Sequence, residues 1–292
     1  MHLKRYFIFL LILFSFSSLF FRVSFALQNE KLVPLYKNGA PDKNGLENEE
    51  EINQGPFKRN VSEAKYSIYL PEKNKSNGKL IIYCPGGAYI SLAFDEENKE
   101  IAKMFNKNGY SYMVLYYRLP NLKHHQIPGN DLKQAVIVAR ENSKKWNINP
   151  DKIGFMGFSA GGHLAATGAF LFEKEYKPKF LILYSPVISM EKKYAHNHSR
   201  LALLGRMPSS KIIEKYSLEK QINKESPPVF IAYSKDDEVV DPKNSELLIE
   251  ALIKNKRNVE KEVFNVGGHA FFAYPENKEI LNKKLIRWLD KY

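Results

Sequence analysis

The sequence predicts an α/β fold with a mainly parallel central sheet and helices on both of its faces. Short runs rich in β-branched and aromatic residues alternate with longer amphipathic segments from about residue 64 to the end of the chain. Two of these runs, Leu80–Tyr83 and Phe180–Leu183, are apolar throughout, which is typical of strands buried on both faces. Alternation of such strands with helices implies parallel pairing through crossover connections.

The pattern places each element in order along one domain, which we expect over residues 63–292. The expected strands cover residues 65–70, 80–84, 111–116, 153–157, 180–184, 229–233 and 260–264. The expected helices cover residues 96–108, 130–146, 161–172, 243–255 and 277–292. We find no internal repeat, so a solenoid or propeller is not expected.

The first 26 residues have the pattern of a signal peptide. Two basic residues precede an apolar run over residues 6–21, and the small-x-small sequence Ser-Phe-Ala follows at residues 24–26. This run is shorter than the roughly 20 residues that span a bilayer. We therefore expect cleavage after Ala26 and a secreted or periplasmic protein with no stable membrane insertion. Retention of the leader as an anchor is the alternative.

Two segments depart from the strand–helix rhythm. Residues 27–62 are rich in Asn, Lys, Glu, Gly and Pro and show no sustained period, so we expect an N-terminal arm that wraps the domain. Residues 185–228 have a mixed pattern and are too numerous for an ordinary connection. We expect them to form a cap-like insertion, a small partial cap over the ends of the strands.

Composition excludes several classes of function. The chain has 292 residues, 44% of them hydrophobic and 26% charged, which is enough to bury one sizeable core. Its formal net charge of +12 is spread among acidic residues without a basic block, so no nucleic-acid partner is expected. The single cysteine, Cys84, excludes an intramolecular disulfide and a cysteine-rich metal site. No histidine pair has the spacing of a helical zinc motif, and we expect neither metal nor organic cofactor.

The strongest chemical signal is the sequence Gly-Phe-Ser-Ala-Gly-Gly at residues 157–162. It lies directly between an expected strand and an expected helix, so Ser159 should sit on a sharp turn with its hydroxyl exposed above the sheet. The helix that follows directs backbone N–H groups and positive dipole potential toward developing negative charge. A glycine-rich turn with a surface serine is the simpler alternative, but this setting predicts a nucleophile.

A serine nucleophile needs a base that is oriented by an acid. In this architecture the partners follow in the order Ser, acid, His, and the sequence meets that order. Acidic residues end the strand near residue 233, and His269 lies on a glycine-rich loop after the last strand. We assign His269 as the base. Among Asp236, Asp237 and Glu238 we assign Asp237 as the acid, with Asp236 as the first alternative.

A second glycine-rich loop, Pro-Gly-Gly-Ala-Tyr at residues 85–89, follows the first buried strand. Such a loop can direct backbone N–H groups toward the negative oxygen of an acyl intermediate. We expect the oxyanion hole to consist of the N–H groups of Gly87, Ala88 and Ala160. An ordinary Pro-Gly turn is the alternative for this loop.

Taken together, these motifs resemble the secreted α/β-hydrolase esterases related to acetylxylan esterases and to bacterial feruloyl-esterase-like proteins. The resemblance runs from about residue 64 to the end of the chain. Its motifs are Cys-Pro-Gly-Gly-Ala-Tyr at 84–89, Tyr-Arg-Leu at 117–119, the segment 148–166, Tyr-Ser-Pro-Val-Ile-Ser at 184–189, His-Ser-Arg at 198–200, Leu-Leu-Gly at 203–205, Asp-Asp-Glu-Val-Val at 236–240, Asn-Ser at 244–245 and Gly-Gly-His at 267–269.

The resemblance implies an α/β-hydrolase fold whose triad falls on Ser159, Asp237 and His269, with oxyanion donors on Gly87, Ala88 and Ala160. Two positions depart from the family. Alanine stands at 88 in place of the usual third glycine, and Val-Asp-Pro stands at 240–242 where the family has Val-Pro.

The resemblance also implies the substrate, namely short acyl groups, acetyl first, on oligosaccharides such as acetylated xylan fragments. The motifs alone require only an ester or amide. A general short-chain carboxylesterase or feruloyl esterase is the main alternative, and a binding protein of the same fold without catalysis is the second. The sequence does not indicate an oligomeric state.

Overall fold

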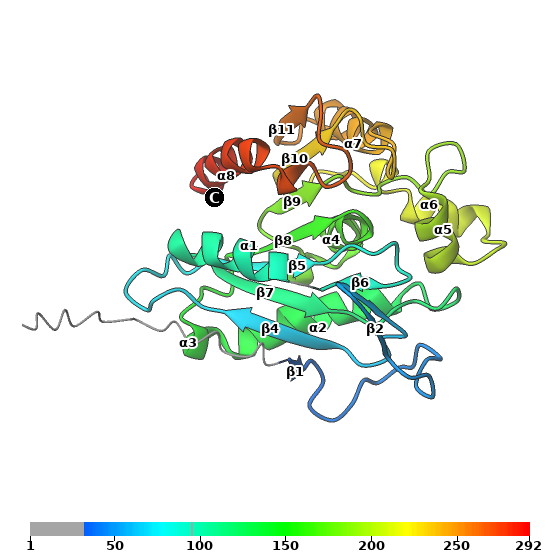
Figure 1. Ribbon diagram of the computed structural model, residues 1–292, viewed down its shortest axis with the longest axis horizontal. Helices are drawn as coiled ribbons and strands as arrows, with labels where there is room; N and C mark the ends of the chain where they lie inside the picture. The colour runs from blue at the N-terminus through cyan, green and yellow to red at the C-terminus, as the bar shows by residue number, and fades with distance from the viewer. Residues whose placement is uncertain (1–31, 95) are drawn as a thin grey trace, which may run out of the picture. The chain divides into compact units, whose positions relative to one another are not determined.

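The computed structural model describes residues 32–94 and 96–292, and within this part an eight-stranded sheet forms the centre of the chain (Figure 1). The strand order is β1-β4-β7-β5-β8-β9-β10-β11. The strands from β7 to β11 pair in parallel, and β1 and β4 pair antiparallel at one edge. The predicted mainly parallel sheet is confirmed.

Seven strands of this sheet lie where the sequence predicts them. They are β4 (Lys65–Tyr69), β5 (Leu80–Cys84), β7 (Ser111–Tyr116), β8 (Ile153–Phe158), β9 (Leu181–Tyr184), β10 (Val229–Ser234) and β11 (Val259–Phe264). Every residue of β5, β7, β9 and β10 is buried, as expected for strands covered on both faces.

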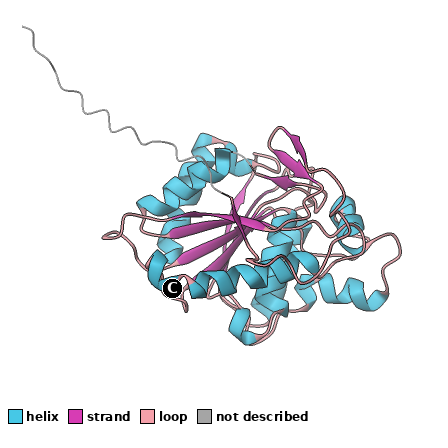
Figure 2. Cartoon of the chain, turned by 90° about the horizontal axis from the view of Figure 1, so that it is seen from below, coloured by secondary structure: helices cyan, strands magenta, loops and turns pink. Residues whose placement is uncertain are grey.

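Helices cover both faces of the sheet (Figures 1 and 2). They are α1 (Glu96–Lys107), α2 (Ile127–Glu141), α3 (Ser143–Trp146), α4 (Ala160–Leu171), α7 (Lys243–Lys254) and α8 (Pro275–Leu289), with the short η1 (Lys174–Tyr176) and η3 (Phe271–Ala273). The single helix predicted over residues 130–146 is two helices, because Asn142 leaves the helical conformation, with φ −95° and ψ 7°, and its side chain donates to the carbonyl of Val138. All but one residue of α4 are buried, so this helix lies deepest against the sheet.

Residues 32–62 contain three short strands that the sequence analysis missed. Strand β1 (Val33–Pro34) pairs with β4, and β2 (Ile52–Gln54) and β3 (Phe57–Arg59) form a small sheet with β6 (Leu92–Ala93). Strands of two or three residues are too short to show an alternating pattern.

A buried ion pair ties this N-terminal segment to the domain. The guanidinium of Arg118 lies 2.6 Å from the carboxylate of Asp131, and both side chains are buried. The same guanidinium donates to the backbone carbonyl and the carboxylate of Asp42, while the hydroxyl of Tyr36 donates to Asp131. The segment thus supplies the remaining hydrogen bonds that a buried charge pair requires.

Residues 185–228 contain three short helices next to the carboxyl end of the sheet, α5 (Asn197–Leu204), α6 (Ser210–Tyr216) and η2 (Leu218–Lys220) (Figure 1). The backbone of Val187 donates to the carbonyl of Ser159, and Leu218 donates to Ile188. These bonds hold the base of the insertion against the turn that carries Ser159.

The predicted leader, residues 1–26, lies outside the described residues. Within the described part of the chain, no helix has the length and apolar character needed to span a membrane.

Candidate active site

Ser159 occupies the turn between β8 and α4 with backbone angles φ 56° and ψ −123°. A residue with a side chain is rarely found at such a positive φ, and this strain is typical of functional sites. The turn needs glycine on both sides, because a Cβ on Gly157 would lie 2.2 Å from the carbonyl oxygen of Gly161. A Cβ on Gly161 would lie 2.1 Å from the carbonyl oxygen of Cys84. The sequence around Ser159 is therefore dictated by close backbone approach.

Three side chains from separate loops form one hydrogen-bonded chain. His269, in the loop between β11 and η3, has its Nε2 atom 2.9 Å from the Oγ atom of Ser159. Its Nδ1 atom lies 2.8 Å from Oδ2 of Asp237, which follows β10. The structure thus brings together the three residues that the sequence analysis predicts for catalysis.

The Asp237 side chain is almost completely buried, and both of its carboxylate oxygens accept hydrogen bonds. Its Oδ1 atom accepts hydrogen bonds from the N–H groups of Val239 and Val240, each at 2.9 Å. Burial raises the pKa of this carboxyl, but the bond and charge of His269 and the two amides outweigh burial and hold the pKa below its ordinary value. Asp237 is thus an anion suited to orient an imidazole.

The neighbouring Asp236 has a different set of partners. It accepts hydrogen bonds from the N–H groups of Gly268, at 2.8 Å, and Gly267, at 3.2 Å, and from the hydroxyl of Ser234. Asp236 therefore fastens the loop that carries His269, while Asp237 contacts the imidazole itself. The sequence analysis left these two acids as alternatives, and the geometry favours Asp237 as the partner of His269.

The loop that follows β5 lies directly beside Ser159. A Cβ on Gly86 would be 3.2 Å from the Cβ of Ser159. Gly87, Ala88 and Tyr89 all have positive φ, at 130°, 57° and 60°, and the carbonyl of Gly87 accepts bonds from the amides of residues 90 and 91. This geometry is consistent with the N–H groups of Gly87 and Ala88 acting on a substrate oxygen.

Ala160 is the first residue of α4, so its N–H is one of those that a helix cannot pair internally. It follows Ser159 directly, which is where the second arm of an oxyanion hole is expected. Ala88, where the resemblance leads one to expect glycine, has a left-handed conformation that costs an alanine about 1–2 kcal/mol.

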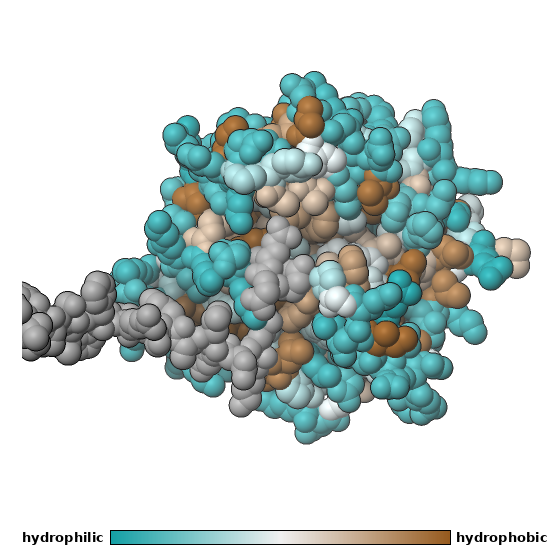
Figure 3. All heavy atoms as spheres, viewed as in Figure 1, coloured by the Kyte–Doolittle hydropathy of each residue, from teal (hydrophilic) through white to brown (hydrophobic). Residues whose placement is uncertain are grey.

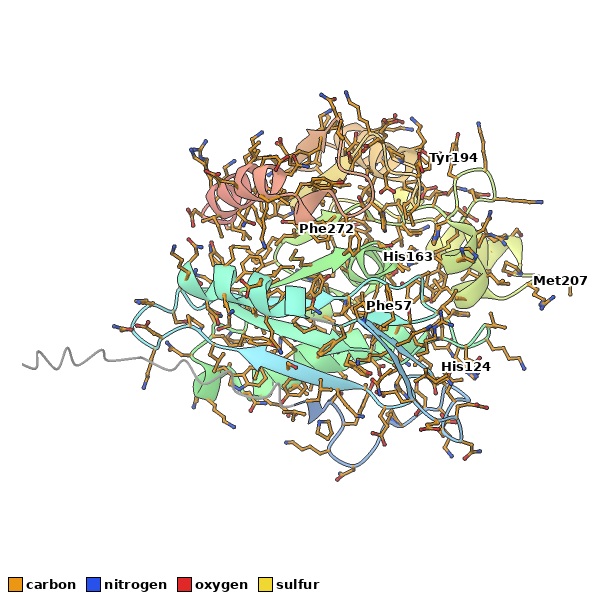
Figure 4. All side chains as sticks on the ribbon, in the orientation of Figure 1. Phe57, His124, His163, Tyr194, Met207 and Phe272 are labelled. Atoms are coloured by element: carbon orange, nitrogen blue, oxygen red, sulfur yellow. The ribbon has the colours of Figure 1, made fainter. Side chains whose placement is uncertain are left out.

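A buried histidine that the sequence analysis did not assign to the site connects the oxyanion loop to the cap. His163 lies on α4 (Figure 4). Its Nδ1 atom lies 3.0 Å from the hydroxyl of Tyr89, and its Nε2 atom lies 2.9 Å from the backbone carbonyl of Tyr216. A carbonyl can only accept, so Nε2 donates to it and Nδ1 accepts from Tyr89. Burial lowers the pKa of His163 to about 4, which keeps the ring neutral. Only the spacing of four residues from Ser159 hints at this role in the sequence.

Residues 66–252 match the BD-FAE protein family, a range that includes Ser159 and Asp237 and ends before His269. The chain belongs to this family. The resemblance inferred from the sequence motifs is therefore confirmed.

Curated relatives agree with this membership. An acetylxylan esterase of Xylanibacter ruminicola is 33% identical over 222 residues, which cover 74% of this chain and 46% of that protein. An endo-1,4-β-xylanase B of Butyrivibrio fibrisolvens is 33% identical over 203 residues, which cover 65% of this chain and 32% of that protein. The chain thus spans less than half the length of these two relatives.

Solved structures share the fold along most of the chain. An acetyl ester-xyloside bifunctional hydrolase from Caldicellulosiruptor lactoaceticus has a TM-score of 0.75 and 29% identity, covering 90% of this chain and 96% of the other. A carboxylesterase of Lactobacillus plantarum has a TM-score of 0.67 and 19% identity, covering 83% and 96%. The α/β-hydrolase fold predicted for this BD-FAE member is confirmed.

The two adjacent acids give a test of the site. Asp237→Asn should lower kcat by about 10⁴-fold, because an amide does not stabilise a charged imidazole. Asp236→Asn should lower kcat by about 10²-fold or less, because this substitution only loosens the loop that carries His269. Steady-state hydrolysis of an aryl acetate by both variants checks this order, and a larger loss for Asp236→Asn would contradict it.

The neutral state of His163 makes folding stability depend on pH. The ordinary pKa of about 6.5 in the unfolded chain falls to about 4 in the folded protein. The stabilising contribution is therefore complete above pH 6.5 and is lost as the pH falls toward 4, a loss of about 3 kcal/mol. His163→Gln keeps a donor and an acceptor but takes up no proton, so it should remove this loss.

Urea unfolding between about pH 7.5 and about pH 4 measures the effect as the difference between the two proteins. We expect the wild type to lose more stability than His163→Gln on acidification. If the free energy of unfolding fell equally with pH in both proteins, this result would contradict a buried neutral histidine.

Proposed function

We propose that this protein is a serine carboxylic ester hydrolase that works through an acyl-enzyme intermediate. The observation that carries the proposal is the hydrogen-bonded chain of Ser159, His269 and Asp237, with distances of 2.9 and 2.8 Å. The family membership and the names of the relatives support the same reaction class.

In the acylation step, the Oγ atom of Ser159 attacks the ester carbonyl while Nε2 of His269 takes the hydroxyl proton. The carbonyl oxygen becomes negative and accepts hydrogen bonds from the N–H groups of Gly87, Ala88 and Ala160. The bond to the alcohol then breaks, and His269 returns the proton to the departing alkoxide. Asp237 orients the imidazole and stabilises its charged form throughout.

In the deacylation step, His269 takes a proton from water, and the resulting hydroxide attacks the acyl-enzyme carbonyl. The same backbone N–H groups hold the negative oxygen. Collapse of this intermediate releases the carboxylic acid, and the proton returns to the Oγ atom of Ser159. The protein itself supplies all of these groups, so the proposal needs no cofactor.

We further propose that the substrate carries a short acyl group, acetyl first, on an oligosaccharide such as an acetylated xylan fragment. Three observations support this. Relatives and a structural neighbour are named for acetyl esters and xylosides or xylan. The methyl group of Ala88 narrows the space beside the oxyanion donors for a bulky acyl group, an effect of about 1–3 kcal/mol at most. The segment over residues 191–200, a loop and the start of α5, is polar, whereas a lipase lid exposes an apolar face.

The polarity of the surface agrees with a water-soluble substrate rather than a lipid. On the coloured part of the face in Figure 3, hydrophilic residues predominate and strongly hydrophobic residues are scattered among them. A large apolar patch would instead favour a lipid interface.

Export of the protein is also part of the proposal, because polymeric saccharides lie outside the cell. The support is the leader pattern of residues 1–26. N-terminal sequencing of protein from its natural host should find Leu27 first, and an intact Met1 in a membrane fraction would favour an anchored protein.

Activity toward a series of esters tests the reaction and the acyl preference together. The value of kcat/KM should fall from acetyl through butyryl to octanoyl and feruloyl esters, and acetate should be released from acetylated xylo-oligosaccharides. Ser159→Ala should retain at most a rate about 10³–10⁴-fold above that of uncatalysed hydrolysis in water, which is what substrate binding and an oxyanion hole alone supply. Ser210→Ala, at an exposed position of α6, should keep full activity.

Preference for octanoyl esters, or no acetate release from any saccharide, would leave a general carboxylesterase. Preference for feruloyl esters would indicate a feruloyl esterase. Turnover by Ser159→Ala within tenfold of wild type would refute the catalytic assignment, and an inactive wild type would favour a binding protein.

A further inference from the structure

A cavity of about 610 Å³ borders the catalytic acid on the side of the cap. One wall is the cap loop over residues 194–198, and the other is the loop over residues 237–242. The lining residues are Tyr194, Ala195, His196, Asn197, His198, Asp237, Glu238, Val239, Asp241 and Pro242. Asp237 is therefore shared between the catalytic chain and this cavity.

A buried amide joins the two walls. The side chain of Asn244 donates to the backbone carbonyl of Tyr194, at 2.9 Å, and to that of Asp241, at 3.1 Å. Its oxygen accepts the N–H groups of Ile188 and Ser189 at the base of the cap. Asn244 is fully buried, so these four bonds fix the cap loop relative to the loop of the catalytic acid. The cavity is thus a preorganised feature of the fold.

The lining is polar, and its groups suit a neutral ligand with several hydroxyls. It offers the ring of Tyr194, two imidazoles, the amide of Asn197 and the carboxylates of Glu238 and Asp241. No lysine or arginine is among the lining residues, which disfavours an anion, and the few apolar side chains are small, which disfavours a lipid. Aromatic, amide and carboxylate groups together can stack against a sugar ring and hydrogen-bond its hydroxyls.

His196 can contribute its imidazole to such a ligand. Its Nδ1 atom lies 2.8 Å from the hydroxyl of the buried Ser199, which fixes the ring in the wall of the cavity. Burial, followed by the nearby His198 and His269, lowers the pKa of His196, which favours the neutral form of the ring. A neutral imidazole can donate to a hydroxyl or accept from one.

The position of the cavity indicates that it binds the alcohol half of the substrate. His269, whose Nε2 atom lies 2.9 Å from the Oγ atom of Ser159, gives its proton to the departing alcohol. The cavity borders Asp237, which is bound to His269, and His196 in its wall is close enough to His269 for the two rings to interact electrostatically. The cavity is therefore next to the group that serves the departing alcohol, which favours a saccharide unit of the alcohol half as its ligand.

We propose that this cavity binds a saccharide unit of the alcohol half of the substrate, one or more units beyond the ring that carries the ester. The proposal rests on the proposed ester hydrolase function and adds the place where the saccharide is recognised. It makes Tyr194 and Asn197 residues that determine specificity for oligosaccharides over simple esters.

Substitution of Tyr194 tests the proposal with a well-matched control. Tyr194 and Tyr176 are both partly buried, and each has a lysine Nζ atom 4.9 Å from its ring centroid. Tyr176 lies in η1, beyond the far end of α4 from Ser159, and outside the cavity. Figure 4 labels Tyr194 close to α7 at the outer part of the cap.

Tyr194→Ala should lower kcat/KM for an acetylated xylotriose about tenfold more than it lowers kcat/KM for p-nitrophenyl acetate or for a monosaccharide acetate. Tyr176→Ala should leave the ratio of these activities at the wild-type value. Equal losses on all three substrates for Tyr194→Ala would indicate a structural role and would overturn the proposal.

A binding experiment separates this proposal from the hydrolase function. Titration calorimetry with unacetylated xylotriose should detect binding to Ser159→Ala and a loss of about tenfold in affinity when Tyr194→Ala is added. Unchanged affinity would overturn the saccharide site even if the enzyme is an esterase. Failure of the wild type to hydrolyse any ester would refute the proposed function, while this titration would still decide the binding site.

Discussion

The backbone turn at Ser159 is the constraint on which the rest of the structure depends. A serine at φ 56° between a central strand and a buried helix persists only when the surroundings hold it there. Backbone contacts with the ends of β5 and β9 supply that support, since Gly161 packs against the carbonyl of Cys84 and the N–H of Ser159 donates to Tyr184. The strain is thus distributed over three neighbouring parallel strands.

Parallel strand order explains why the partners of Ser159 come from distant parts of the sequence. The carboxyl ends of parallel strands meet at one edge of the sheet, and ligands of open α/β sheets bind there. The loops after β5, β10 and β11 carry the proposed oxyanion donors, Asp237 and His269. The insertion after β9 covers the same edge and is fastened to it through His163 and Asn244. The site and the cap therefore share one scaffold.

Much of this arrangement can be predicted from the sequence because burial and turn chemistry leave local signals. Continuous apolar runs reveal the strands, and the motif from Gly157 to Gly162 reveals the turn of the nucleophile. Chain order is enough to nominate His269, which lies beyond the residues matched by the family. The fold and the three catalytic candidates could thus be named without coordinates.

Other features have no local signal because they depend on which groups meet across the fold. Asp236 and Asp237 are adjacent and chemically equal, and only the partners of each side chain distinguish them. The contact of His163 with Tyr89 joins a helix to a loop 74 residues earlier in the chain. Asn244 is part of a motif that resembles the family, but only the structure shows that its side chain joins the two walls of the cavity. The two-residue strands β1 and β6 exist only through their pairing partners.

Covalent labelling with an arylphosphonate ester is the most direct test of the acyl-enzyme chemistry at the centre of this account. The reagent reacts with a serine that is activated by an imidazole and places a tetrahedral group in the oxyanion hole. Mass spectrometry of the inactivated protein should find one adduct, on the peptide that carries Ser159, and His269→Ala should prevent labelling. An adduct on another residue, or inactivation without any adduct on Ser159, would contradict the account.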